Sequence, residues 1–151
     1  MWSHPTLLFP VISVGPFMKW GIDYMMCNPA LAGGHKYIIV DVDYFTKWAE
    51  AMPTFKADGE TAAFFVFNQI IARFGIPKEI VTDHGSHFQN SMMNELTTML
   101  GFRQEHSSSF YRQANNQVEP VNKTLKTIIK CTINAVHSNW HIMLYPVLWA
   151  Y

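Results

Sequence analysis

The chain has 151 residues, 49% of them hydrophobic and 15% charged, and its 11 Lys and Arg balance its 11 Asp and Glu. This length fits one domain with a core of its own, and the hydrophobic content excludes a disordered chain. The zero formal charge argues against a protein that binds nucleic acid through a general excess of basic residues.

The cysteine content and the lack of targeting segments indicate in which cellular compartment the protein is expected. Two cysteines are too few for a disulfide framework and favour a reducing environment. The first residues lack the basic and apolar regions of a signal peptide, and no apolar run is long enough to span a membrane. We therefore expect an intracellular protein that is neither secreted nor inserted in a membrane.

The first half of the chain predicts three strands and a helix. Prolines are frequent in residues 1–15, which we expect to form an irregular lead-in. A helix is predicted over 58–74, because Asp58 can cap it and Gly75 is typical of a helix C-terminus. Pro53 is expected to end the strand before this helix. Alternating and β-branched residues predict strands, paired as a meander, over 17–25, 36–43 and 46–52.

The second half predicts shorter strands and more helix. Asn90 or Ser91 is expected to cap a helix that Gly101 ends, and residues 107–116 are a polar loop. Strands are predicted over 79–82 and 102–106, and helices over 90–100, 117–137 and 139–151. This order of elements indicates a mixed α/β fold with one sheet flanked by helices.

Three acidic residues occupy positions suited to a metal site. Asp23 lies in an otherwise apolar strand, Asp83 follows a strand where α/β sheets tend to hold their sites, and Glu119 begins a long helix. Each alone has a simpler structural explanation: a solvated strand face, a turn before glycine, or a charge that complements the helix dipole. Together they suggest a carboxylate cluster for Mg²⁺, which prefers oxygen ligands.

Short motifs around these carboxylates carry a family resemblance. Asp83 and Glu119 are separated by 35 residues, the D-x35-E spacing of integrases. The motifs are WGID (20–23), VDYFTKW (42–48), FGIP (74–77), TDHGSHF (82–88), QANNQVE (113–119) and LWAY (148–151). Over residues 16–151 the chain closely resembles the integrase catalytic core of gypsy-type LTR retrotransposons, especially plant ones, within the retroviral integrase superfamily.

The resemblance implies an RNase H-like α/β fold, with a five-stranded mixed sheet flanked by helices. It implies that Asp23, Asp83 and Glu119 are the catalytic residues and that they hold two Mg²⁺ or Mn²⁺ ions. The implied enzyme is a polynucleotidyl transferase with endonuclease activity, which processes the 3′ ends of element DNA and joins them to target DNA. An RNase H-type hydrolase would share the fold and the metals, but the D-x35-E spacing argues against it.

A row of lysines shares the helix face of Glu119. Lys123, Lys126 and Lys130 lie within about 40° of Glu119 around an α-helix. A solvated lysine face would explain this pattern. A strip that contacts phosphates beside the metal site would also explain it, and lysines at these places resemble the DNA-contacting lysines of the family.

The segment that resembles the mobile active-site loop departs from the family pattern. Asn115 and Gln117 are expected to contact DNA there, but Arg112 stands in place of a proline and Asn116 in place of a glycine. Pro120 follows the catalytic glutamate and is expected in the first turn of the helix that begins near Gln117. These departures leave an alternative open: a catalytically silent relic that keeps the fold and binds nucleic acid weakly.

Other polar residues near the motifs are assigned to the structure. Asp43 is expected to have a structural role and not to bind metal. Asp41 shares its strand face and is unusual for the family. His84 and His87 are expected to form hydrogen bonds or packing contacts, although histidines can bind metals elsewhere.

Partners and location are implied by the resemblance. DNA is the implied partner, both as element ends and as target, the intact enzyme is implied to be a homo-oligomer, and the location is nuclear. The chain is expected to be a catalytic core from a larger polyprotein, with its last helix truncated. Because its net charge is zero, this piece alone is expected to bind DNA weakly, with a shallow salt dependence.

Overall fold

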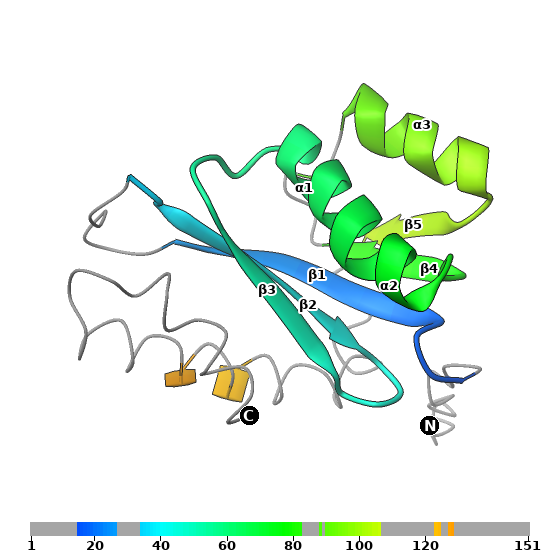
Figure 1. Cartoon of the computed structure of the whole chain (residues 1–151), viewed down its shortest axis with the longest axis horizontal. Coiled ribbons are helices and arrows are strands. Elements are labelled where there is room, and N and C mark those ends of the chain that lie inside the picture. Colours follow the sequence, from blue (N-terminus) through cyan, green and yellow to red (C-terminus); the bar gives the residue numbers. More distant parts are fainter. Residues whose placement is uncertain are drawn as a thin grey trace, which may run out of the picture.

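The computed structural model describes residues 15–26, 34–82, 88, 90–106, 123–124 and 127–128. These residues form a five-stranded sheet in the order β3-β2-β1-β4-β5 (Figure 1). β1 pairs antiparallel with β2 and parallel with β4, so the predicted mixed sheet is confirmed. The strands are β1 (Lys19–Met26), β2 (Tyr37–Asp43), β3 (Ala49–Thr54), β4 (Glu79–Thr82) and β5 (Arg103–His106).

One continuous helix follows β3, as predicted, and its ends have the predicted residues. The Asp58 side chain accepts a hydrogen bond from the Thr61 N–H at 2.9 Å, and Gly75 ends the helix at a φ of 93°. Its middle winds as a π-helix, which was not predicted. The helix consists of α1 (Gly59–Phe65), η1 (Val66–Ile71) and α2 (Ala72–Phe74).

The π-helical turn has a local cause. The Asn68 side-chain amide donates to the Phe64 carbonyl at 2.9 Å. That carbonyl is the acceptor that the Asn68 backbone N–H would use in an α-helix, so the side chain competes with the regular bond.

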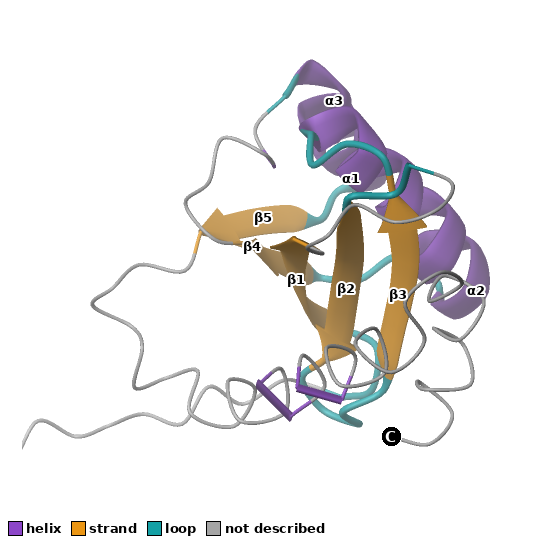
Figure 2. Ribbon diagram, turned by 90° about the vertical axis from the view of Figure 1, so that its left-hand side faces the viewer, coloured by secondary structure: helices purple, strands orange, loops and turns teal. Residues whose placement is uncertain are grey.

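The second described helix, α3 (Ser91–Leu100), matches its predicted ends. The Asn90 side chain accepts a hydrogen bond from the Met93 N–H at 2.8 Å, and Gly101 closes the helix in a left-handed conformation with a φ of 74°. Figure 2 shows α1, α2 and α3 on the same side of the sheet.

The core lies between this helix layer and the sheet. Trp20 and Ile22 of β1 pack in one buried cluster with residues of the helices, among them Phe65, Ile70 and Met93. The opposite sheet face is buried as well, because Ile38, Val40 and Val42 of β2 are at most 4% exposed. β2 is therefore covered on both faces, as expected for an inner strand of a layered α/β fold.

The prediction that Pro53 ends its strand was wrong. β3 continues through Thr54, and Pro53 pairs with Ile38 of β2. β3 is an outer strand of the sheet, and an outer strand tolerates proline because the missing N–H points away from the partner strand.

Several predicted segments lie outside the described residues, most of them in the C-terminal half. This applies to the lead-in up to residue 14, to the loop 107–116 and to nearly all of the helices predicted over 117–137 and 139–151. Lys123, Thr124, Thr127 and Ile128 are described and are helical, and the Thr127 hydroxyl donates to the Lys123 carbonyl at 2.8 Å. Figure 1 shows these short pieces on the side of the sheet away from α1 and α3.

Candidate active site

Asp23 lies in β1, where it pairs with Val40 of β2 and follows Ile22, the last β1 residue that pairs with β4 in the described residues. Its chain neighbours Ile22 and Tyr24 contribute to the core under the helices. Because side chains alternate along a strand, Asp23 points to the other face of the sheet. It is half-buried, and its Oδ1 accepts a hydrogen bond from the Tyr24 N–H at 2.9 Å. The carboxylate therefore sits on a rigid strand.

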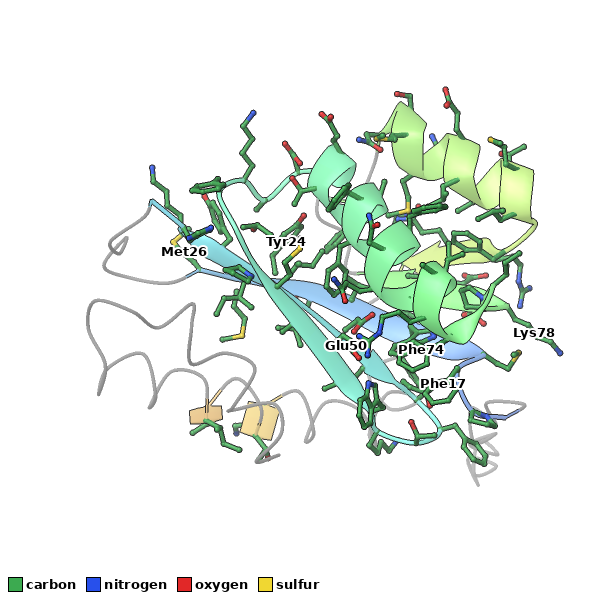
Figure 3. The ribbon with its side chains drawn as sticks, viewed as in Figure 1. Phe17, Tyr24, Met26, Glu50, Phe74 and Lys78 are labelled. Atoms are coloured by element: carbon green, nitrogen blue, oxygen red, sulfur yellow. The ribbon has the colours of Figure 1, made fainter. Side chains whose placement is uncertain are left out.

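Tyr24 fixes this part of β1 to the helix layer. Its hydroxyl donates to the Asp58 carbonyl at 2.8 Å, and its ring stacks on Phe88 with centroids 5.2 Å apart (Figure 3). Burial, helped by the Asp58 carboxylate, raises the pKa of Tyr24 above its ordinary value. The phenol therefore keeps its proton and continues to donate, which holds the residue next to Asp23 in place.

The parallel pairing of β1 and β4 relates Asp23 to the next carboxylate of the sequence. Ile22 is the Cα partner of Thr82, and each is followed directly by an aspartate, Asp23 and Asp83. Asp83 and Glu119 lie outside the described residues. The convergence of the three carboxylates therefore stays a prediction.

Thr82 anchors the end of β4. It is 1% exposed, and its hydroxyl lies 3.1 Å from Nδ1 of His106 in β5. The Gln104 amide donates to the Thr82 hydroxyl at 3.4 Å and to the Phe88 carbonyl at 3.2 Å. The residue before Asp83 is thus held by hydrogen bonds to the neighbouring strand.

Asp43 has the structural role predicted for it. Its Oδ1 accepts the Phe17 N–H at 3.1 Å, and its Oδ2 accepts the Thr46 N–H at 2.8 Å and the Thr46 hydroxyl at 2.6 Å. Its carbonyl accepts the Lys47 N–H at 2.9 Å. Phe17 and Lys47 both have positive φ, at 63° and 65°, so Asp43 holds two strained positions beside the β2–β3 turn.

Asp41 belongs to a buried polar network that the sequence interpretation missed. Its Oδ1 accepts the Glu50 N–H at 3.1 Å, while its Oδ2 has no hydrogen-bond partner among the described residues. Glu50 accepts the Trp48 indole N–H at 2.7 Å and pairs with Arg73 of α2 at 2.7 Å. In Figure 3, Glu50 lies on the side of the sheet that α2 covers.

The network is separate from Asp23. Asp41 pairs with Ile22, whose side chain lies in the core under the helices, so Asp41 and Asp23 face opposite sides of the sheet. Burial raises the pKa of Asp41 well above its ordinary value, and the Glu50 carboxylate adds to the effect. The hairpin register alone, which pairs Asp41 with Glu50, could have revealed the pair from the sequence.

Comparison with known families identifies the family of this fold. Residues 14–111 match the family model described as the integrase core domain. The chain belongs to the integrase core domain family.

This integrase core is similar to parts of retroviral polyproteins. It is 34% identical over 130 residues to the Gag-Pol polyprotein of baboon endogenous virus and to the Pol polyprotein of feline endogenous virus ECE1. It is 32% identical over 130 residues to the Pol polyprotein of radiation murine leukemia virus. Each match covers 85% of this chain but only 8%, 12% and 22% of those relatives. The gypsy-type assignment stays a prediction.

The predicted donor set of the integrase core would fit a hard divalent cation. Asp23 offers carboxylate oxygens from a rigid strand, and the predicted partners Asp83 and Glu119 would complete an all-oxygen set, as Mg²⁺ and Mn²⁺ prefer. Among the described residues there is no group of three His, Cys, Asp or Glu side chains that could hold a metal. Asp83 and Glu119 lie outside those residues.

Of the predicted DNA contacts, Lys123 alone falls in the part of the chain that the structure describes, where it is exposed and helical. The other predicted contacts, together with the two histidines beside Asp83, lie outside it: Asn115, Gln117, Lys126, Lys130, His84 and His87. Within the described ranges, no helix of the integrase core has the length and apolar character needed to cross a membrane.

Proposed function

We propose that this integrase core is a metal-dependent polynucleotidyl transferase for DNA integration, with Asp23, Asp83 and Glu119 as its catalytic carboxylates. The observation that supports this most directly is the parallel pairing of Ile22 with Thr82, because the next residue after each is an aspartate. Two Mg²⁺ or Mn²⁺ ions are the proposed cofactors. The proposed partners are element ends and target DNA, acted on in the nucleus by a homo-oligomer of the intact enzyme.

The proposed reaction needs no covalent nucleophile from the protein. In end processing, a water oxygen bonds to phosphorus, the bond from phosphorus to the 3′ oxygen breaks, and a 3′-hydroxyl is released. In strand transfer, that hydroxyl attacks a target phosphodiester and a target 3′-hydroxyl leaves, so one phosphodiester replaces another. Bound divalent ions supply positive charge at the attacking and leaving oxygens.

The chain contributes fixed positions for the carboxylates that would hold these ions. Asp23 is held in β1 by its pairing with Val40 of β2, and its orientation is supported by the hydrogen bond from the Tyr24 N–H. The hydrogen bonds at Thr82 restrain the residue before Asp83. Such preorganisation matters because phosphoryl transfer is accelerated mainly by positioning and charge stabilisation.

A nicking or disintegration assay on branched DNA with Mn²⁺ tests the proposal. Asp23→Asn, Asp83→Asn and Glu119→Gln should each lower the rate by about a thousandfold or more, because several kcal/mol of charge stabilisation are lost. Glu105→Gln, an exposed carboxylate of β5, is the matched control and should cleave like wild type. Equal rates for wild type and Asp83→Asn would overturn the carboxylate assignment.

Calorimetry separates this proposal from a catalytically silent relic. The folded wild-type chain should take up Mn²⁺, and the Asp23→Asn variant should bind it at least tenfold more weakly, because a charged ligand is lost. A folded chain that neither takes up Mg²⁺ or Mn²⁺ nor cleaves DNA would be the relic.

A further inference from the structure

A small surface at one end of the sheet combines cationic and aromatic side chains. We call it the sheet-end surface and define it as Met26, His35, Lys36, Phe55 and Lys56. Its members converge because β1 ends, β2 begins and β3 ends at the same place: Met26 pairs with Tyr37, and Tyr37 pairs with Thr54. The Lys36 N–H also donates to the Thr54 carbonyl at 3.2 Å. Figure 3 shows Met26 at this end, opposite Lys78.

The sheet-end surface lies close to the candidate active site. Met26 follows Asp23 by three positions along β1, which corresponds to about 10 Å at the rise of a β-strand. A nucleic-acid strand advances about 3.4 Å per nucleotide. A strand with its reacting phosphate at Asp23 would therefore reach this surface within about three nucleotides.

Phe55 presents one face of its ring to solvent. Its other side is occupied, because the His35 ring stacks on it with centroids 4.1 Å apart and planes inclined by 23°. A Cβ atom on Gly34 would also lie 3.6 Å from the Phe55 ring. Since the side chain is nevertheless 59% exposed, its open side is a flat aromatic platform held in place from behind.

The lysines beside this platform are exposed, and they outnumber the nearby carboxylate. Lys36 directly precedes β2, and Lys56 follows Phe55 after the end of β3. The nearest acidic residue along the chain, Asp58, is engaged at the start of α1, where hydrogen bonds from Thr61 hold its pKa below the ordinary value. The charge of Lys56 also lowers the pKa of Asp58, and together the two ammonium groups exceed this one negative charge.

We infer that the sheet-end surface binds the DNA strand next to the reacting phosphodiester, with Phe55 stacking an unpaired base and Lys36 and Lys56 contacting phosphates. The inference rests on the proposed function, since it needs a DNA strand at Asp23. An exposed aromatic face with two lysines at the same end of the sheet matches a nucleotide, which offers a base face and a phosphate. The contact would be independent of sequence, because every base has such a face.

Equilibrium binding of fluorescent DNA to the whole chain tests the inference without catalysis. Two probes are compared in EDTA at low ionic strength: a blunt duplex, and the same duplex with a short single-stranded end. Phe55→Ala should weaken binding of the single-stranded end about tenfold and leave the blunt duplex nearly unchanged. Phe55→Trp, which keeps a stacking face, should preserve the preference for the single-stranded end.

The lysines are tested by salt dependence. Lys36→Ala and Lys56→Ala should each weaken both probes and lower the slope of log K against log salt by about 0.9. Lys78→Ala removes an exposed lysine from the opposite end of the sheet and should leave the slope unchanged. All substituted residues are exposed or half-exposed, and thermal unfolding confirms that each variant folds.

The outcomes separate this inference from the proposed function. If wild type binds the probes and the Phe55 and lysine variants bind them equally well, the inference that the sheet-end surface binds DNA is overturned, while the proposed function stands. If wild type binds neither probe at low salt, the proposed function fails and the surface fails with it. Loss of binding in Lys78→Ala equal to that in the surface variants would show only a general charge effect and would overturn the surface.

Discussion

Asp41 and Asp43 lie two positions apart on the same face of β2, and both are completely buried, yet their carboxylates differ in how many of their oxygens accept hydrogen bonds. Both carboxylate oxygens of Asp43 accept hydrogen bonds, from Phe17 and Thr46. Asp41 accepts one bond from Glu50, and its second oxygen has no partner in the described part of the chain. A buried polar atom without a partner is costly, so the two residues should affect stability differently.

Asp41 should make the folded state less stable as pH rises. Its pKa is raised in the folded state, chiefly by burial, whereas in the unfolded chain it is about 3.9. Above about pH 4 the unfolded state therefore loses a proton that the folded state keeps. The free energy of unfolding should fall by up to about 1.4 kcal/mol per pH unit until the folded-state pKa is reached.

Urea unfolding of wild type and Asp41→Asn between pH 4 and pH 8 measures this effect. Asparagine keeps an acceptor for the Glu50 N–H but does not titrate, so the variant should show a flatter pH dependence and a relative gain in stability at neutral pH. Glu105→Gln, at an exposed site, should follow wild type. Parallel pH curves for wild type and Asp41→Asn would show that Asp41 does not keep its proton on folding.

Replacing Asp43 should be destabilising, because both of its carboxylate oxygens accept hydrogen bonds. Asp43→Asn turns a donor group toward the Thr46 N–H and hydroxyl, which at present donate to Oδ2. We expect the free energy of unfolding to fall by about 2–4 kcal/mol. Thr46→Ala removes only the hydroxyl contacts and should cost about 1 kcal/mol. A loss for Asp43→Asn no larger than that for Thr46→Ala would contradict the structural role of Asp43.

Gly59 is required by the cap of the neighbouring helix. A Cβ atom at position 59 would lie 2.6 Å from Cγ of Asn90, whose side chain caps α3 through the Met93 N–H. Gly59→Ala should therefore lower stability by about 1–3 kcal/mol, although alanine favours helix. Thermal and urea unfolding measure the change.

A double-mutant cycle isolates the cause. Asn90→Gly removes the side chain that the new methyl group would meet, and glycine is itself an acceptable N-cap that costs only a few tenths of a kcal/mol. In the Asn90→Gly background, Gly59→Ala should be neutral or stabilising. An unchanged penalty in that background would show that the contact with Asn90 is not the reason for glycine.

Divalent metal should stabilise the folded chain through the proposed catalytic carboxylates. A ligand that binds only the folded state adds about 1.4 kcal/mol at ten times its Kd. Mn²⁺ should therefore raise the Tm of wild type and of Glu105→Gln, and should raise that of Asp23→Asn much less. Equal shifts in all three proteins would place the metal away from Asp23.

Local features of the fold were predictable because their causes are local. The sequence predicts Asp58 as a cap and offers Asn90 or Ser91 as the second one, since an N-cap acts on a backbone N–H three residues away. Gly75 and Gly101 were recognised as helix ends for a similar reason. Pro53 was misjudged because its effect depends on whether the strand is outer or inner, which the sequence does not state. The π-helical turn escaped because it depends on the rotamer that lets Asn68 reach Phe64.

The candidate site also has a part that the sequence predicts and a part that it does not. The resemblance of the motifs singled out Asp23, and the structure places it in β1 next to Val40 as the strand prediction required. The network of Asp41, Glu50 and Arg73 was missed because its members come from two strands and a helix, so no short motif contains them. Only the pairing register of β2 and β3 brings the first two together.

Pro53 has a consequence for how copies of the chain can associate. An outer strand normally offers a row of N–H and C=O groups to which another strand can add, and this is a route to aggregation. Pro53, which pairs with Ile38 of β2, has no N–H and so removes one donor from the outer edge of β3. A continuous ladder between the β3 edges of two molecules is therefore interrupted, which protects a chain that is 49% hydrophobic from edge-to-edge aggregation.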